Sequence, residues 1–241
     1  MTAPARSGWM DLLGLAEDEV PRLLVLESTW WRQDALDRRL TALSDVRELG
    51  MPDLWHGWHG ELPVAYGVVY GAPHAVERVH VLGTCGTPVV AHLGSCGALS
   101  PALQVGDIVL PEKATIGEGA SQYYGGSGAA PANLGKVARA AALLAARGVH
   151  AHRGTTVTTS AALAMPARLL KQWQKAGHLA VDLEASAVFS AAAAFSMRAV
   201  SLLYVWDALP RRPVSAEFTE EEQEAQEHAA AEVWDIALQL G

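Results

Sequence analysis

A glycine-rich stretch near the middle of the chain, Gly94-Ser95-Cys96-Gly97, carries the first pattern with chemical potential. An apolar run beginning at Val89 precedes it, so the glycines fall at the end of an expected buried strand. Glycines in such a place let a ligand approach the main chain and leave backbone N–H groups free to point at an anion. The same spacing is typical of a tight connection between two core strands. Both interpretations stay open on the spacing alone.

Two acidic residues, Asp182 and Glu184, lie in the apolar surroundings of Val181, Leu183 and Ala185. A carboxylate in such surroundings is costly unless it has a partner. One expectation is that the pair caps the helix that follows. The other is that Glu184 accepts hydrogen bonds from two neighbouring hydroxyl groups of a ligand, because charged acceptors make the stronger hydrogen bonds.

A third carboxylate, Asp207, follows the apolar run from Ser201 to Val205, a pattern that predicts a buried strand. Ligands of α/β proteins bind at the carboxyl ends of strands, which is where this aspartate is expected. Beside the apolar Trp206, it is a candidate to donate a proton to a bound molecule. The alternative is an aspartate that caps a helix or a turn.

Short apolar runs alternate with segments of helical periodicity along the whole chain. This order predicts an α/β protein with a three-layer fold, in which helices flank a mixed, largely parallel central sheet. Strands are expected at Leu23–Leu26, Val64–Tyr70, around Val89 and Ile108, at Val149–Val157 as a strand pair, and at Ala199–Val205. Helices are expected at Thr29–Leu43, His74–Leu82, Lys136–Arg147, Leu169–Ala176, Ala185–Met197 and Glu217–Leu240.

The length of 241 residues predicts one domain over residues 1–241. Residues 1–20 are expected to form an N-terminal extension that is irregular apart from a short helix or turn at Leu12–Leu15. Residues 125–132, rich in glycine and alanine, are expected to form a loop.

Half of the residues are hydrophobic and the net charge is −8, with no block rich in lysine and arginine. An extended polyanion such as a nucleic acid is therefore not an expected partner. The first residues lack the apolar run of a signal peptide, and no span is long and apolar enough to cross a bilayer. The sequence thus predicts a soluble, cytoplasmic protein that acts on neither nucleic acids nor membranes.

The two cysteines, Cys85 and Cys96, lie eleven residues apart without the spacing of a zinc site or a disulfide framework. Both are expected to be reduced and buried. The cluster from Trp55 to His59 alternates histidine with other residues but has no carboxylate or cysteine at ligand spacing. A hairpin at the surface or at a subunit contact is expected there, and no metal site.

Several motifs together resemble those of the nucleoside phosphorylase-I superfamily, which holds purine nucleoside phosphorylases, uridine phosphorylases and nucleosidases. The resemblance runs from about Tyr66 to the C-terminus, and its motifs occur in the order and at the spacing of that family. The motifs are Gly94–Ala98, Val105–Val109, the Glu-Gly-x-Ser-x-Tyr-Tyr segment Glu118–Tyr124, Val181–Ala185, and Asp207.

The resemblance implies roles for individual residues. Glu184 matches the glutamate that binds the ribose in the family, and Asp207 matches the aspartate that purine-specific relatives use near N7 of the base, so both are expected to be catalytic. Because uridine-specific relatives usually lack an acid there, a purine or purine-like base is favoured. Tyr70 is expected at the ribose, unless its ring is a core aromatic. The other implied substrate-binding residues are Ser95, Cys96, Gly97, Val157, Asp182 and Leu183.

The expected phosphate site departs from the family pattern. Relatives end the first strand in a Gly-Asp-Pro loop followed by an arginine, whereas this chain has Glu27 where a glycine would offer an N–H group, then two tryptophans and Arg32. A carboxylate would repel a phosphate dianion at close range. A second family arginine is His92 here, which is mostly neutral at pH 7. The remaining phosphate ligands are expected to be Arg32, His92, Gly94 and Ser95, with binding that strengthens as His92 becomes protonated.

Three functions stay open from these residues. The first is phosphorolysis of a nucleoside to a free base and ribose 1-phosphate, with inorganic phosphate as co-substrate and no cofactor or metal. The second is a nucleosidase that activates water, where Glu27 would help. The third is a repurposed nucleoside-binding protein. Glu184 and Asp207 favour catalysis, and the family resemblance implies a homo-oligomer, either a trimer or a hexamer.

Overall fold

The computed structural model describes residues 4–209 and 217–241, so the first three residues of the expected N-terminal extension lie outside the described residues. A single mixed sheet joins its strands in one hydrogen-bonded network. The strands are β1 (Leu23–Ser28), β2 (Ser44–Glu48), β3 (Leu54–His59), β4 (Leu62–Val69), β5 (Val89–Ala98), β6 (Ile108–Gly117), β7 (Ala129–Pro131), β8 (Ala151–Thr159), β9 (Ala180–Asp182) and β10 (Arg198–Ala208).

Strand β1 lies in the middle of the sheet and pairs in parallel with β4 on one side and β5 on the other. β10 also pairs in parallel with β5, whereas β3 and β2 extend the sheet beyond β4 in antiparallel fashion. The apolar run of β1 is buried on both faces, as a central parallel strand requires. Because β1, β4, β5 and β10 run in one direction, their carboxyl ends meet at the same edge of the sheet.

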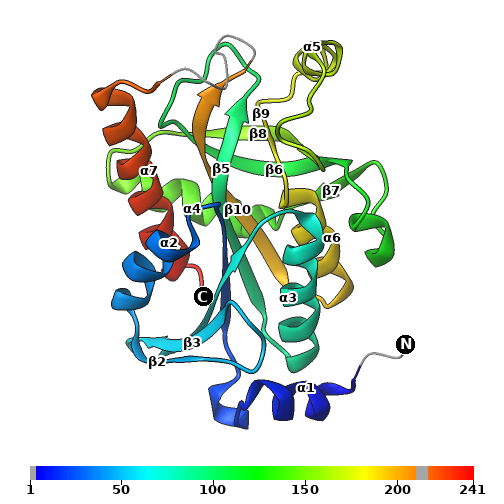
Figure 1. Cartoon of the computed structure of the whole chain (residues 1–241), viewed down its shortest axis with the longest axis vertical. Helices are drawn as coiled ribbons and strands as arrows, with labels where there is room; N and C mark the ends of the chain where they lie inside the picture. Colours follow the sequence, from blue (N-terminus) through cyan, green and yellow to red (C-terminus); the bar gives the residue numbers. More distant parts are fainter. Residues whose placement is uncertain (1–3, 210–216) are drawn as a thin grey trace.

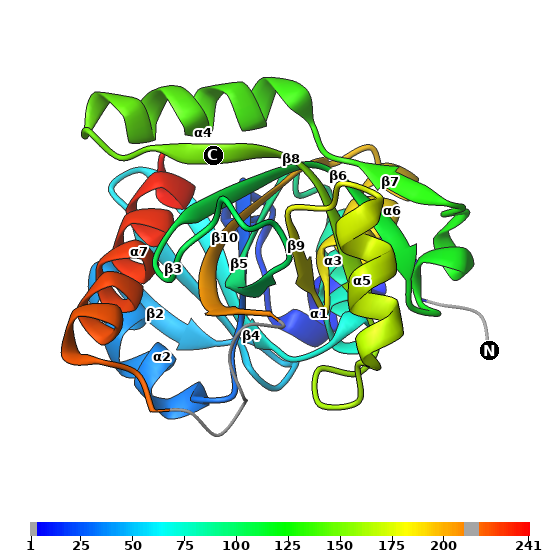
Figure 2. The ribbon, with the colours of Figure 1, turned by 90° about the horizontal axis from the view of Figure 1, so that it is seen from above.

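Part of the sheet closes into a ring, which the sequence patterns do not predict. β10 pairs with both β5 and β6, β6 pairs with β8, β8 with β9, and β9 returns to β5. Figure 2 shows these strands from above. A separate apolar cluster draws its buried residues from this ring, namely Cys96, Ala98, Leu103, Val109, Ala180, Leu203 and Val205.

Helices cover both sides of the central strands. Helices α2 and α7 lie on one side of β5 and β10, and α3 and α6 lie on the other (Figure 1). This arrangement confirms the expected α/β class with a mixed sheet flanked by helices. The helices are α1 (Arg6–Leu13), α2 (Arg32–Arg39), α3 (Ala72–Cys85), α4 (Leu134–Ala146), α5 (Ala167–Lys175), α6 (Ala185–Ala194) and α7 (Glu220–Leu238).

Several elements differ from their expected bounds. β5 continues through the glycine-rich stretch to Ala98, so this stretch is a strand and not a turn. Residues 149–157 do not form a strand pair, because the single strand β8 begins at Ala151 and continues to Thr159. The expected loop over residues 125–132 contains β7, and the N-terminal extension holds helix α1. Each of these segments gains its structure from a neighbour in the fold, which periodicity alone does not report.

The cluster from Trp55 to His59 forms strand β3, with β2 and β4 on its two sides. Trp55 and His56 are buried there, and Nε2 of His56 lies 3.0 Å from the carbonyl oxygen of Glu19. Both cysteines are free and buried, as expected. Among the residues that the structure describes, no helix has the length and apolar character needed to cross a membrane.

Candidate functional site

Three polar side chains meet where β1, β5 and β10 lie side by side, at the end of β1 and in the first halves of β5 and β10. In the sheet register His92 of β5 pairs with Leu26 of β1 and with Ser201 of β10. Because side chains at alternate positions of a strand share a face, Ser28 lies on the same face as Leu26, beside the His92 ring. Nε2 of His92 is 2.9 Å from the Ser28 hydroxyl oxygen, and Nδ1 is 2.9 Å from the Ser201 hydroxyl oxygen.

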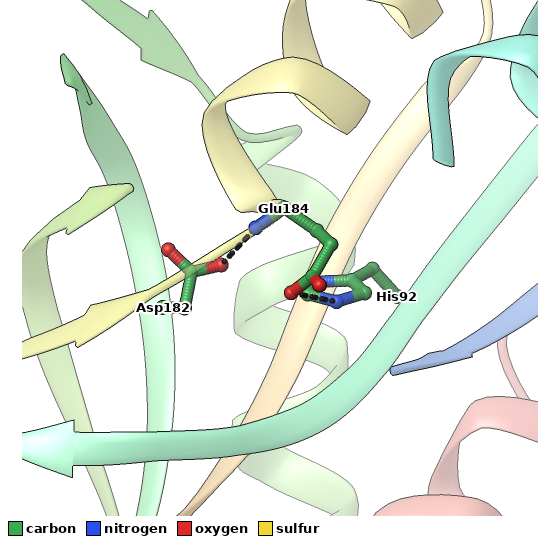
Figure 3. Close-up of side chains that lie close together, drawn as sticks. All are labelled: His92, Asp182 and Glu184. Atoms are coloured by element: carbon green, nitrogen blue, oxygen red, sulfur yellow. Dashed lines mark hydrogen bonds and ion pairs between the residues drawn. The ribbon is translucent and has the colours of Figure 1, made fainter. Parts of the chain in front are cut away.

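Glu184 joins this group from the start of α6. Its side chain is 3% exposed and does not cap its own helix, although the residue occupies the N-cap position. Instead, Oε1 accepts a hydrogen bond of 2.6 Å from the backbone N–H of Gly71, and the Ser28 hydroxyl donates a further hydrogen bond to this carboxylate. Oε2 lies 3.7 Å from Nε2 of His92 (Figure 3).

Gly71 presents its N–H group to Glu184 because of an unusual backbone conformation. Its φ is 83°, in the left-handed region that glycine adopts without strain, at the N-cap of α3. The Gly-x-Pro turn that the sequence places here therefore supplies a main-chain donor to the carboxylate, a role that the sequence pattern does not reveal.

Asp182 caps α6, which makes the capping alternative correct for this residue and not for Glu184. Its Oδ2 accepts the backbone N–H of Ala185 at 2.6 Å and that of Glu184 at 3.2 Å, the latter drawn in Figure 3. Its Oδ1 accepts the hydroxyl of Thr158 at 2.7 Å. The negative charge of Asp182 thus lies at the positive end of the helix dipole.

Burial shifts the pKa values of Glu184, Asp182 and His92. Loss of solvent, followed by the charge of the nearby Asp182, raises the pKa of Glu184 to about 8. Burial also raises the pKa of Asp182 to about 6 and lowers that of His92 to about 3. The directions agree with each other, because each favours the uncharged form of a buried group. Near neutral pH, His92 is therefore a neutral ring.

The neutral state of His92 overturns one expectation. His92 is fully buried between two hydroxyl groups and has a pKa of about 3, so it does not become a cation near neutral pH. Phosphate binding that strengthens with its protonation is therefore not expected from this structure. His92 remains a candidate phosphate ligand only as a neutral hydrogen-bonding group.

Arg32 and Glu27 have partners within the protein. The guanidinium of Arg32 pairs with Asp53 and lies 5.5 Å from the ring centroid of Trp55. Glu27 is buried, receives two hydrogen bonds of 3.0 Å from Arg39, and accepts the hydroxyl of Tyr66 at 2.8 Å. Glu27 is thus neutralised by Arg39, which removes both the expected repulsion of phosphate and the expected activation of water.

The glycine-rich stretch presents one free hydroxyl group. Ser95 is exposed, whereas Gly94 and Cys96 on either side of it are buried. Gly94 pairs with both β1 and β10, so its main chain belongs to the sheet and does not form the expected open anion cradle. The side chain of Ser95 is therefore the accessible polar group of this stretch.

Asp207 lies at the end of β10, opposite Gly97 of β5. A side-chain carbon at Gly97 would come within 3.1 Å of Oδ1 of Asp207, so the glycine leaves room for this carboxylate. Burial raises the pKa of the Cys96 thiol, and the charges of Asp182 and Asp207 raise it further. These contacts bring Cys96, Gly97, Asp182 and Asp207 into one neighbourhood.

Exposed aromatic rings form the rim beside Glu184. Tyr70, directly before Gly71, is 45% exposed and is therefore not a core aromatic. Its ring centroid is 5.7 Å from that of Trp30, which is 6.1 Å from that of Trp31, and Trp31 lies 5.3 Å from Trp206. The tryptophans do not pack into the core at the helix start, since Trp30 and Trp31 are 56% and 51% exposed.

A cavity of about 520 Å³ adjoins this site through Gly71, the main-chain donor to Glu184, while Glu184, Ser28 and His92 do not line it. The start of α3, the segment from Glu118 to Tyr124 and the end of β8 line it, and Gly71 belongs to its wall. A volume of this size accommodates a small molecule. Glu118 is tied to α6, because it accepts the hydroxyl of Ser186 at 3.0 Å. The motif Glu118–Tyr124 thus forms part of the wall.

The ligand atoms of His92, Asp182 and Glu184 lie within 4.8 Å of one another, a spacing that a metal ion could share. Hydroxyl groups contact both ring nitrogens of His92, however, and Asp182 accepts three hydrogen bonds. The atoms of His92 and Asp182 that could bind a metal therefore already have hydrogen-bond partners within the protein. The expectation of a site that works without metal stays a prediction.

The comparison with known proteins places this geometry in a family. A sequence model described as "Phosphorylase superfamily" matches residues 56–238, about three quarters of the chain. The chain belongs to the phosphorylase superfamily. The family resemblance drawn from the motifs is confirmed, and with it the expected enzyme class, that of the nucleoside phosphorylases.

Relatives within the phosphorylase superfamily are distant. The chain is 25% identical over 205 residues to a purine nucleoside phosphorylase (DeoD-type) from Bacillus cytotoxicus, covering 83% of each chain. It is 26% identical over 163 residues to the corresponding protein from Alkaliphilus metalliredigens, covering 66% of this chain and 70% of that one. The fold is similar to that of a uridine phosphorylase from Vibrio fischeri solved with 6-hydroxy-1-naphthoic acid, with a TM-score of 0.81, 21% identity and coverage of 94% and 93%.

Two residues with roles implied by the family lie mainly in apolar surroundings. Val157 is buried in a cluster with Leu99, Leu170 and Val181, and Leu183 is half-buried. Their predicted contacts with a substrate stay predictions.

Four residues of the site had no predicted role: Ser28, Gly71, Thr158 and Ser201. A signal for Ser28 was present, since it ends the buried apolar strand β1, and ligands of α/β proteins bind at the carboxyl ends of such strands.

Proposed function

We propose that this chain cleaves the N-glycosidic bond of a nucleoside by phosphorolysis, releasing a free base and ribose 1-phosphate. The observation that carries the proposal is Glu184, a buried carboxylate that receives hydrogen bonds from Gly71 and Ser28, of which Gly71 also lines a cavity of about 520 Å³. A nearly buried acid next to a cavity is typical of a functional site. The cavity and the family membership together support a small-molecule substrate.

Glu184 holds the sugar in this proposal. Cleavage builds positive charge on the ribose and negative charge on the leaving base, so the sugar must be oriented firmly. Gly71 binds one carboxylate oxygen, and the other accepts hydrogen bonds from the vicinal hydroxyl groups of the ribose. Tyr70, exposed one residue before Gly71, contacts the sugar from the rim.

Asp207 acts on the base as a general acid, which favours a purine or purine-like leaving group. Its place beside Gly97 at the carboxyl end of β10 supports this role. The purine nucleoside phosphorylases among the relatives agree with a purine, whereas the similar uridine phosphorylase fold leaves the base open. A comparison of purine and pyrimidine nucleosides as substrates therefore tests which base is released.

The nucleophile binds on the side of Ser95, whose exposed hydroxyl is available to phosphate. Arg32 contributes a positive charge only after leaving Asp53, and His92 contributes a hydrogen bond without charge. Little positive charge is therefore available to bind phosphate, which favours a second candidate function, hydrolysis by water. Glu27 is not the base for that reaction, because Arg39 and Tyr66 occupy its carboxylate.

Incubation with adenosine, inosine, guanosine and uridine, each with and without phosphate, tests these proposals. We expect the purine nucleosides to release base in the presence of phosphate, with ribose 1-phosphate as the second product and a rate that saturates with phosphate. Free ribose formed at the same rate without phosphate would establish hydrolysis instead. Failure of all four nucleosides to react under both conditions would contradict cleavage.

A cytoplasmic homo-oligomer, either a trimer or a hexamer, completes the proposal. Light scattering on the purified protein would measure its mass. A monomer that turns over nucleosides at full rate would contradict the need for assembly.

A further inference from the structure

A continuous chain of polar contacts runs from β10 to Glu184. The hydroxyl of Ser201 lies 2.9 Å from Nδ1 of His92, and the hydroxyl of Ser28 lies 2.9 Å from Nε2 on the other side of the ring. Ser28 in turn donates to Glu184. Ser201 and His92 are fully buried, so the chain is closed to bulk water at that end.

The contacts decide which nitrogen of His92 carries the proton. When Glu184 is ionised, above its pKa of about 8, Ser28 donates its one hydroxyl hydrogen to this carboxylate, so the Ser28 oxygen is free to accept from Nε2–H of the ring. Nδ1 then accepts the hydroxyl hydrogen of Ser201. The opposite tautomer would turn the lone pair of Nε2 toward the Glu184 carboxylate oxygen 3.7 Å away, an unfavourable contact.

We infer that His92 is a positioning residue: through its Nε2–H group it orients the Ser28 hydroxyl toward Glu184 and thereby fixes the carboxylate that binds the sugar hydroxyls. Ser201 selects the tautomer that makes this possible. The inference rests on the proposed function, because it concerns the carboxylate that holds the ribose there. It gives a role to a buried histidine without any charge on the ring.

Two substitutions of His92 separate positioning from packing. His92→Leu removes both ring nitrogens but keeps an apolar side chain in the buried space. His92→Gln keeps an amide N–H that can donate to Ser28 at a similar reach. Circular dichroism and thermal unfolding of both variants show whether the fold is retained.

The readout is the dissociation constant of a purine ribonucleoside and of its 2′,3′-dideoxy analogue, measured by calorimetry. We expect His92→Leu to raise the dissociation constant of the ribonucleoside about tenfold or more, because the loss acts through the sugar hydroxyls. The dissociation constant of the dideoxy analogue should change by no more than about twofold. His92→Gln should recover most of the ribonucleoside affinity. Equal losses for both ligands, or no recovery with glutamine, would overturn the inference.

A second measurement does not depend on nucleoside binding. In protein labelled with ¹⁵N-histidine, the resonance absent from His92→Gln identifies His92 among the nine histidines. We expect a protonated Nε2 and an unprotonated Nδ1 at pH 9.5, where Glu184 is ionised, and a change in that pattern in Ser201→Ala. A protonated Nδ1 in the wild-type protein would overturn the inference even if nucleosides are cleaved. If the expected tautomer is found but no nucleoside binds, the proposed function fails while the hydrogen-bond chain stands.

Discussion

Glu184 is almost removed from solvent, and the hydrogen bonds from Gly71 and Ser28 only partly offset the loss of hydration of its charged form. The pKa of about 8 expresses this imbalance. A ligand that supplies further donors would favour the charged form, because hydrogen bonds to a carboxylate lower its pKa. Ligand binding and ionisation of Glu184 are therefore coupled.

This pKa predicts how stability varies with pH. The ordinary pKa is 4.5 and the folded value is about 8, so between these values the folded protein holds a proton that the unfolded chain has lost. The free energy of unfolding therefore falls as pH rises through this window. Relative to wild type, Glu184→Gln should gain roughly 1–3 kcal/mol between pH 5 and pH 9. Urea unfolding at several pH values measures this, and parallel curves for both proteins would contradict it.

At acid pH, the titration of His92 changes the free energy of unfolding in the opposite direction to that of Glu184. Its folded pKa of about 3 lies below the ordinary 6.5, so the unfolded chain binds the extra proton between these values. Stability from His92 is present above pH 6.5 and is lost as pH falls toward 3. The contributions of His92 and Glu184 oppose each other between pH 4.5 and 6.5.

Asp207 has a prediction of its own. If it protonates the base, Asp207→Asn should lower the rate with a purine nucleoside about 100-fold or more, because asparagine cannot donate that proton. An aryl riboside whose leaving group departs without protonation should lose much less. Equal losses on the two substrates would mean that Asp207 has a structural role.

At the scale of elements, the turn between β4 and α3 is predicted to couple backbone conformation to sugar binding. Gly71→Ala strains a φ of 83° and should cost about 1 kcal/mol of stability, although the nearest atom to the added carbon is 3.9 Å away. Because the N–H donor to Glu184 shifts, KM for a ribonucleoside should rise severalfold. Gly14→Ala is the matched control, since Gly14 has a φ of 67° and ends α1. A similar rise in KM in both variants would contradict the coupling.

The elements that the sequence predicts best are those with their own periodicity. The apolar runs of β1 and β4 and the helical pattern before the C-terminus fall close to the observed bounds. The course of β5 through Gly94 and Gly97 was not predictable, because pairing with β1, β9 and β10 holds these glycines in a strand. Local residue preference indicates a turn there, and tertiary pairing overrides it.

In the candidate site, too, local sequence patterns identify some residues, whereas contacts between distant parts of the chain are not predicted. Motif spacing identified Glu184 and Asp207, and the structure places Glu184 just after β9 and Asp207 near the end of β10, two strands that both pair with β5. The partners of Glu184 come from Ser28 and Gly71, more than a hundred residues earlier in the chain. Periodicity carries no information on such distant contacts. The pairing of Glu27 with Arg39, twelve residues later in the chain, is likewise not predicted by periodicity, so the sequence alone indicates that Glu27 repels phosphate.

In the molecule as a whole, strand β5 links elements from the two ends of the chain. β5 pairs with β1 near the N-terminus and with β10 near the C-terminus. We therefore keep the prediction of one domain over residues 1–241 and expect a single unfolding transition, coincident by tryptophan fluorescence and circular dichroism. Two separated transitions would contradict it.

The most direct test of the account compares base release from a purine ribonucleoside by the wild-type protein and by Glu184→Gln, with phosphate present and at pH 8. Glutamine keeps the shape of the side chain but loses the charge that accepts from both sugar hydroxyls. Loss of two charge-assisted hydrogen bonds predicts a fall in kcat/KM of at least about 100-fold, with the far-ultraviolet circular dichroism unchanged. A folded Glu184→Gln variant with near wild-type kcat/KM would contradict the assignment of this site to the sugar.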